Sequence, residues 1–356
     1  MKHKSLFVLA VPALWAFAAP ADRIAFDVES GTSLTKTISS ETELSMDDMT
    51  VAMNGEEMDI ASMMGGLEMN ISTTAETVVT DEYGSASDGR PSRLKRTYDR
   101  IANDTTMESS GMPMMGGEDM SMSGSSDLEG TTVVFTWNSE NEDYDVAFDE
   151  GEEGDEELLE DLIEDIDLRA FLPTESVSAG DTWEVDNTAM IAILAPGGNL
   201  KIMPEDMGEM GDMMGMPGNG MNPFDHMGEF DGTITAEYAG MRGEFAVIKL
   251  EVDVSTSNDM TEMISELMDD MDIPEEMGEI EMDYETVDIE LEFEGSGELL
   301  WNVAGGHFQS FELSGETITA MDMAYSMSMG GQDMSMEMAM EMSGTQTISM
   351  SVAVSE

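Results

Sequence analysis

The sequence lacks cysteine altogether and holds only three histidines in 356 residues. No disulfide, thiol nucleophile or lipobox anchor can therefore form. Neither His226 nor His307 lies in a zinc pattern such as H-E-x-x-H, and the chain has no G-x-S-x-G elbow. A carboxylate pair of the glycosidase type stays open, because spacing among 77 acids is uninformative. We expect a non-catalytic protein with no catalytic and no cofactor-binding residues.

Basic residues are also scarce, since 13 Lys and Arg face 77 Asp and Glu, for a formal net charge of -64. Such a chain repels nucleic acid and anionic membranes, which both bind basic surfaces. It favours cations or basic proteins as partners. Two interpretations of the charge stay open: adaptation to a saline exterior, or a solubilising surface that keeps methionine-rich strands apart.

Long hydrophobic runs are missing apart from residues 5–17, which are too few to span a membrane comfortably. This run follows a short basic stretch at residues 1–4 and ends in Ala16-Phe17-Ala18, a small-x-small cleavage pattern. The sequence therefore predicts a signal peptide at residues 1–18 and export to the periplasm or the exterior, with no transmembrane segment.

What is present is alternation, with apolar residues mostly at every second position. It runs through residues 67–83, 94–102 and 133–148. We expect a mainly β fold, with a long antiparallel meander or curved sheets, arranged as one unit or as two related halves.

The last fifty residues alternate most clearly, with apolar side chains at odd positions over 311–329 and even positions over 334–354. A turn at 330–333 would make a hairpin with both sets on one face and Met327 opposite Met336. We hypothesise that this methionine face lies on the core or lines a cavity for an apolar ligand.

Each arm of this hairpin would span roughly 65 Å at ~3.3 Å per residue, which exceeds an ordinary strand. The ribbon should therefore bend, and Gly315 and Gly344 are the expected bend points.

Helical spacing occurs near 155–168 and near 259–271, and we expect two amphipathic helices packed on the sheet. The expected division is an N-terminal β-rich half at 19–202, a Met/Gly-rich linker or loop at 203–229, and a C-terminal β-rich half at 230–356. An internal duplication is suggested by Trp-Asn pairs at 137–138 and 301–302, each followed by an aromatic seven residues after the Trp.

One segment, residues 172–183, reads L-P-x-x-x-V-x-x-G-D-x-W. It resembles a segment of uncharacterised exported bacterial proteins classed as domains of unknown function, and residues 90–98 and 297–311 are similar to theirs. The resemblance implies a β-rich exported fold and no known activity. Gly180-Asp181 is expected to form a turn before a strand that begins near Trp183.

Methionine supplies the candidate soft-metal ligands, because thioether sulfur prefers Cu(I) or Ag(I). One cluster consists of Met112, Met114, Met115, Met120 and Met122. Eight residues crowd one loop: Met207, Met210, Met213, Met214, Met216, Met221, His226 and Met227. The alternative function is thus a soft-metal or cation-binding buffer. Against it, methionine is abundant throughout the chain, where it also serves as core filler.

Acidic runs at 149–157 and 269–272 lack the EF-hand order of ligands, so they predict only loosely bound Ca²⁺. A basic strand at residues 90–100 stands out in this acidic chain. It is interpreted either as cross-strand pairing with acidic neighbours or as a docking edge for an acidic group.

Overall fold

The computed structural model describes residues 22–58, 68–110, 120–152, 154–204, 228–269, 280–329 and 332–354. These residues are mainly β, as expected, and they contain a 14-stranded antiparallel sheet and a two-stranded one. The signal peptide expected at 1–18 lies outside the described residues.

The first half of the chain forms β1 (Ser33–Met53), β2 (Glu56–Met58), β3 (Glu68–Tyr83), β4 (Ala86–Ser87), β5 (Arg90–Pro91), β6 (Arg93–Ser110), β7 (Met120–Ser125), β8 (Thr132–Asn138), β9 (Asp143–Phe148), η1 (Glu156–Leu159), η2 (Arg169–Phe171), β10 (Thr182–Val185), α2 (Ala189–Leu194) and β11 (Met203–Pro204). The second half forms β12 (Asp231–Arg242), β13 (Phe245–Asp259), α4 (Thr261–Asp269), β14 (Ile280–Asn302), β15 (His307–Met329) and β16 (Gln332–Val354).

The large sheet consists of two meanders joined at one seam. Strands β12 to β16 pair in chain order, and so do β1, β3, β6, β8 and β9. At the seam, β16 pairs with β1 from Leu34↔Val354 to Met53↔Met336. The two expected halves are therefore parts of one continuous sheet, and β10 from the first half pairs with β12 of the second.

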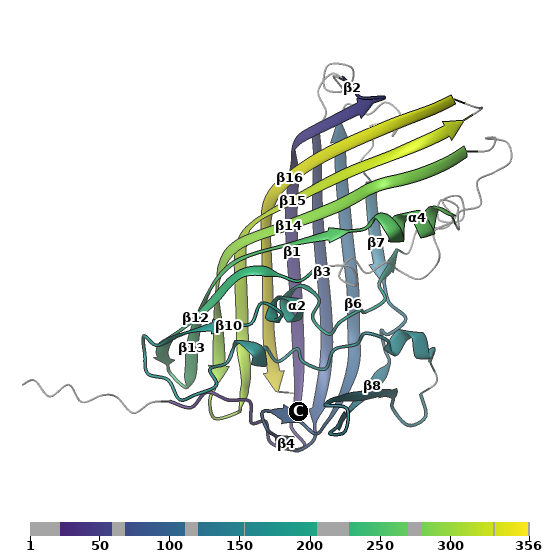
Figure 1. Ribbon diagram of the computed structural model, residues 1–356. Helices are drawn as coiled ribbons and strands as arrows, with labels where there is room; N and C mark the ends of the chain where they lie inside the picture. The colour runs from purple at the N-terminus through teal and green to yellow at the C-terminus, as the bar shows by residue number, and fades with distance from the viewer. Residues whose placement is uncertain are drawn as a thin grey trace, which may run out of the picture.

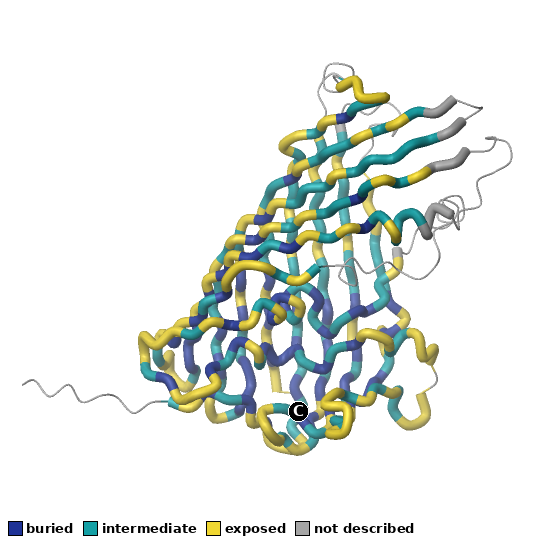
Figure 2. Tube along the Cα trace, in the orientation of Figure 1, coloured by how far each residue is buried: buried dark blue, intermediate teal, exposed yellow. Residues whose placement is uncertain are grey.

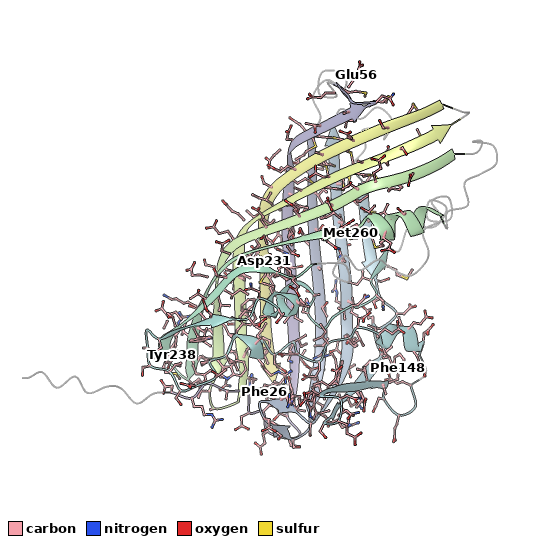
Figure 3. All side chains as sticks on the ribbon, in the orientation of Figure 1. Phe26, Glu56, Phe148, Asp231, Tyr238 and Met260 are labelled. Atoms are coloured by element: carbon pink, nitrogen blue, oxygen red, sulfur yellow. The ribbon has the colours of Figure 1, made fainter. Side chains whose placement is uncertain are left out.

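The sheet curves, and β12 to β16 bend across it while β3 and β6 run nearly straight (Figure 1). Residues 161–171 and 189–202, here called the covering segment, pack on its concave inner face. Buried positions concentrate where this segment lies, and the opposite end of the sheet is mostly half-buried or exposed (Figure 2). Phe26 in the core and Glu56 on β2 mark these two ends (Figure 3).

Inward side chains of the sheet and apolar side chains of the covering segment share one core. Leu34 and Leu299 from the sheet, and Leu168 and Met190 from the covering segment, have no exposed surface. Burying each such side chain contributes about 1.5–3 kcal/mol, so this shared core holds the covering segment in place.

The C-terminal hairpin has the expected shared face, but its register is shifted by two residues. Met327 pairs with Met334, and Tyr325 pairs with Met336. The expectation that Met327 lies opposite Met336 is wrong because β16 already begins at Gln332, so the connection is tighter than a four-residue turn.

Bulges change the parity of two other strands. The pairing of β6 with β3 shifts between Val78 and Val79, so Ile101 is buried while Arg100 points to solvent. A second shift in β1 moves the inward set from Met46 to Met49. Each extra residue turns the following side chains to the other face of the strand.

The helix expected near 155–168 is wrong beyond one turn, since only η1 forms there, capped by Asp155. The Arg96 guanidinium donates hydrogen bonds to the carbonyl oxygens of Ile163 and Glu164. Because the chain here is not helical, Ile166 and Leu168 can each pack into the core. Tertiary contacts thus replace helical ones.

The helix expected near 259–271 is present as α4, beside β14 (Figure 1). Asp259 accepts a hydrogen bond from the Thr261 amide at its start, as an N-terminal cap does. Of the expected linker at 203–229, residues 203–204 form β11, and residues 205–227 lie outside the described ranges.

The Gly180-Asp181 turn is confirmed. Gly180 has φ +92°, and the Asp181 carboxylate accepts a hydrogen bond from the Ser178 amide at 2.7 Å. Trp183 lies in β10, half-buried, and its indole donates to the Phe171 carbonyl at 3.3 Å. This tryptophan ties the edge strand to the covering segment.

The two Trp-Asn pairs close equivalent hairpins. Trp137 pairs with Tyr144 across β8 and β9, and Trp301 pairs with Phe308 across β14 and β15. The equal spacing therefore reflects a shared hairpin geometry. The flanking strands differ, since β8 has 7 residues and β14 has 23.

Candidate ligand-binding site

A cavity of about 400 Å³ lies between the inner face of the sheet and residues 193–202 of the covering segment. Its sheet wall comes from β1, β3, β6, β7 and β16. That wall consists of Ile38, Ser40, Thr42, Thr73, Ala75, Thr77, Asn103, Thr105, Met122, Ser123, Gly124, Gln346 and Ile348. The cavity thus lies beside the β1–β16 seam, where the two meanders meet.

The walls are uncharged with one exception, Lys201, whose amine lies 3.9 Å from Asp161. On the sheet wall, the hydroxyl groups of Thr73 and Thr105 bond each other at 3.2 Å. Ile193 faces them from the covering segment. Although many lining residues are polar, most of the wall surface is apolar, as is typical of small-molecule sites.

Beneath the covering segment lies a fully buried cluster of charges, here called the buried ion cluster. The Lys36 amine contacts Asp81 at 2.7 Å and Asp167 at 2.8 Å. Arg96 donates through Nε to Asp81 at 2.8 Å, and the Tyr83 hydroxyl donates to Asp167 at 2.9 Å. All four ionised side chains are completely buried.

The cluster fastens the covering segment to the sheet. Lys36, Asp81 and Arg96 belong to sheet strands, and Asp167 belongs to the covering segment. Arg96 also donates to the carbonyl oxygen of Glu164 at 2.8 Å. Because charge-assisted hydrogen bonds are the stronger kind, the cluster fixes one wall of the cavity.

Burial and neighbouring charge oppose each other at Asp81. Burial alone would raise the pKa of its carboxyl, but attraction to Arg96 and Lys36 outweighs burial and holds the pKa below its usual value. Burial raises the pKa of Tyr83 well above its usual value, and the charges of Asp167 and Asp81 add to this. Tyr83 therefore remains a hydrogen-bond donor.

A second ion pair joins Glu164 and Arg169 within the covering segment. Burial, reinforced by Asp165 and Asp167, raises the pKa of Glu164 to about 7, although Arg169 and Arg96 oppose the shift. The contacts of Glu164 lie within the fold, so they indicate a structural role.

The expected methionine face of the hairpin is confirmed as inward on β15 and β16, and methionines of β1 extend it. It comprises Met46, Met49, Met53, Met321, Met323, Met327, Met334, Met336, Met338, Met340 and Met342. Most of these side chains are half-buried, and Met342 is buried. The cavity itself contains a single methionine among its lining residues, Met122.

The eight metal candidates that crowd one loop of the sequence all lie outside the described residues: Met207, Met210, Met213, Met214, Met216, Met221, His226 and Met227. Among the residues that are described, no group of three His, Cys, Asp or Glu side chains is placed to hold a metal ion. Asp149 of the first acidic run pairs instead with Lys95 at 2.6 Å. His307 is a buried residue at the start of β15.

Cross-strand pairing explains much of the basic strand. Arg96 pairs with Asp81, and Arg100 lies 3.0 Å from Glu76 on the neighbouring strand. Arg90 stacks on the Trp137 ring at 3.7 Å. β6 is not an edge of the sheet, because it has β3 on one side and β7 and β8 on the other, and docking of an acidic group on its side chains stays a prediction.

Sequence reasoning missed the buried ion cluster, although the alternation contained a signal for it. Lys36 lies between Leu34 and Ile38 on their inward parity, and Asp81 lies between Val79 and Tyr83. A charge at an inward position requires a buried partner.

Comparison with known proteins identifies no family. No protein-family model and no curated protein matches the chain. Among solved structures, the outer membrane protein OprG from Pseudomonas aeruginosa is 8% identical, with 92% of this chain and 99% of that chain covered at a TM-score of 0.18. A putative AttH from Nitrosomonas europaea is 7% identical, with 91% and 98% covered at a TM-score of 0.13.

Likeness at these scores gives no information about the fold or function of this chain. Within the described ranges, no helix is long and apolar enough to cross a membrane.

Proposed function

We propose that this chain is an exported, non-catalytic binding protein that holds an apolar ligand between its curved sheet and its covering segment. The cavity of about 400 Å³ carries this proposal, since ligand pockets commonly measure ~300–1,000 Å³. The signal-peptide pattern at residues 1–18 supports export, and the strongly acidic composition suits a soluble protein of the envelope or exterior.

The residues that line the cavity indicate which class of ligand it can bind. The hydroxyl groups of Thr73 and Thr105 already bond each other, so an apolar guest need not desolvate a free hydroxyl at this pair. Lys201, as the one charged lining residue, can pair with the carboxylate of a fatty acid. We therefore infer a ligand with an apolar body, and a fatty acid is the first probe to test.

Filling the cavity tests this function. Ala75 lines the cavity from β3, so Ala75→Phe places a ring inside it. Thr74→Phe is the matched control, because Thr74 is exposed on the opposite face of the same strand. In titrations with a fluorescent fatty acid, Ala75→Phe should weaken binding about tenfold or more. Thr74→Phe should bind like the wild type.

Two results would contradict the function. One is a purified wild-type protein that carries no extractable lipid and takes up no fluorescent fatty acid. The other is equal binding by both phenylalanine variants. Thermal unfolding of each variant shows whether Ala75→Phe is folded, since overpacking costs about 1–3 kcal/mol.

A further inference from the structure

Methionines gather on the inner face at the end of the sheet away from the covering segment. Near the covering segment, inward positions hold Leu34, Ile38, Phe311 and Ile348. Farther along the same strands they hold the methionine face defined above. Burial alone does not explain this change, because leucine or isoleucine would bury equally well with better-defined rotamers.

The outward positions of the same strand segments show that a general abundance of methionine does not explain the inward methionines. On β16 they hold Ser335, Glu337, Ala339 and Glu341, while methionine alternates with them on the inner side. On these three adjacent strands, the methionines therefore belong to one face of the sheet.

Register brings three of these side chains into one row. Met340 on β16 pairs with Met49 on β1 and with Met321 on β15. Directly opposed Cβ atoms lie ~4.5–5.5 Å apart, and methionine has three rotatable bonds. The two outer thioethers can therefore converge with the central one on a single ion. All three side chains are half-buried.

Neighbouring rows extend the arrangement. Met46 pairs with Met342 on one side of this row, and Met338 pairs with Met323 on the other. Inward positions in these rows carry no carboxylate that would favour a hard cation. One hydroxyl reaches a thioether nearby, where Tyr325 donates to the sulfur of Met336 at 2.9 Å.

We propose that the row of Met49, Met340 and Met321 binds a soft monovalent cation of the Cu(I) or Ag(I) class. Thioether sulfur is a soft ligand that selects such ions. The formal net charge of -64 raises the local concentration of any cation. This site is separate from the apolar cavity, whose lining includes none of the three residues.

Silver is the probe, because Ag(I) needs no reductant. Isothermal titration of the full chain should show Ag(I) binding tighter than about micromolar. The triple variant Met49→Leu, Met321→Leu and Met340→Leu keeps the side-chain volume nearly constant. It should weaken the tightest Ag(I) binding about tenfold or more.

A second triple variant removes the same number of sulfurs from buried positions elsewhere: Met190→Leu, Met260→Leu and Met350→Leu. This control should bind Ag(I) like the wild type. The carbon-13 methyl resonances of Met49, Met321 and Met340 should shift at the first equivalent of Ag(I).

Three outcomes overturn the site. They are wild-type binding weaker than micromolar, equal binding by the first triple variant and the wild type, and equal losses in both triple variants. The last result would show that sulfur number alone, and not this row, determines binding. None of these outcomes depends on fatty-acid binding, so the cavity and the cation site are tested separately.

Discussion

At the scale of single residues, the informative positions are the charges that point inward. Lys36 and Asp81 each contact two opposite charges at complete burial. Burying a charge costs several kcal/mol, which close pairing offsets only when every member has its partner. Removing any one charged side chain of the buried ion cluster should therefore destabilise the fold strongly.

Removal of one carboxylate tests that dependence. Asp81→Asn leaves Lys36 with Asp167 alone and weakens the pairing of Arg96. We expect the free energy of unfolding to fall by about 3–5 kcal/mol in urea denaturation. Glu298→Gln is the control, because it breaks an exposed pair with Arg242 and should cost less than about 1 kcal/mol. Equal losses would show that the cluster is not strongly coupled.

The sequence analysis did not predict these inward charges, although the alternation marks their positions as inward. Leu34 and Ile38, which flank Lys36 at the same parity, are both buried. The partner of Lys36 is 45 positions away at Asp81 and still farther away at Asp167. Pairing at such separation depends on the topology of the whole sheet, which alternation does not specify.

At the scale of elements, long strands need glycine where neighbouring backbones approach closely. A Cβ atom added at Gly344 would lie 1.7 Å from the Glu43 carbonyl oxygen of β1. At Gly315, it would lie 2.4 Å from the Glu294 carbonyl oxygen of β14. These two glycines were the bend points expected from the sequence, and the strands that carry them do bend (Figure 1).

Adding a side chain at the seam should therefore be costly. Gly344→Ala forces β16 away from β1, and we expect a loss of at least about 1–3 kcal/mol in chemical denaturation. Ser343→Ala, one position earlier on the same strand, should change stability by less than about 0.5 kcal/mol. A Gly344→Ala protein as stable as Ser343→Ala would show that the close approach does not constrain the seam.

Elements were predictable where local pattern and tertiary contacts agree. The methionine face of the hairpin and helix α4 follow from alternation and from helical spacing. The helix near 155–168 failed because its carbonyl groups bond to Arg96, a residue more than 60 positions away. The register shift of the hairpin arose at the turn, where a change of two residues leaves the alternation intact.

At the scale of the whole molecule, the seam between β1 and β16 makes one sheet from two meanders. It creates both candidate sites, because the cavity and the row of Met49, Met340 and Met321 each use strands from both ends of the chain. No local pattern in the sequence specifies this pairing. The sequence therefore predicted a curved β protein with a methionine face, but it could not locate the sites on it.

The outer face of the same sheet carries carboxylates directly opposite one another. Asp253, Glu294 and Glu316 form a row across β13, β14 and β15, and all three are exposed. Like charges in this arrangement destabilise a sheet by about 0.2–1 kcal/mol per pair. Salt shortens the Debye length from ~30 Å at 0.01 M to ~3 Å at 1 M and so weakens the repulsion.

Stability should therefore rise with sodium chloride, and Glu294→Gln should show why. At low salt this variant should be more stable than the wild type by about 0.4–2 kcal/mol, because it relieves two repulsive pairs. The gain should shrink as salt rises, which thermal unfolding from 0.01 to 1 M would reveal. Glu298→Gln, which loses an attractive pair with Arg242, should show no gain at any salt concentration. A salt-independent gain for Glu294→Gln would mean that strand propensity, and not charge repulsion, limits the stability of this face.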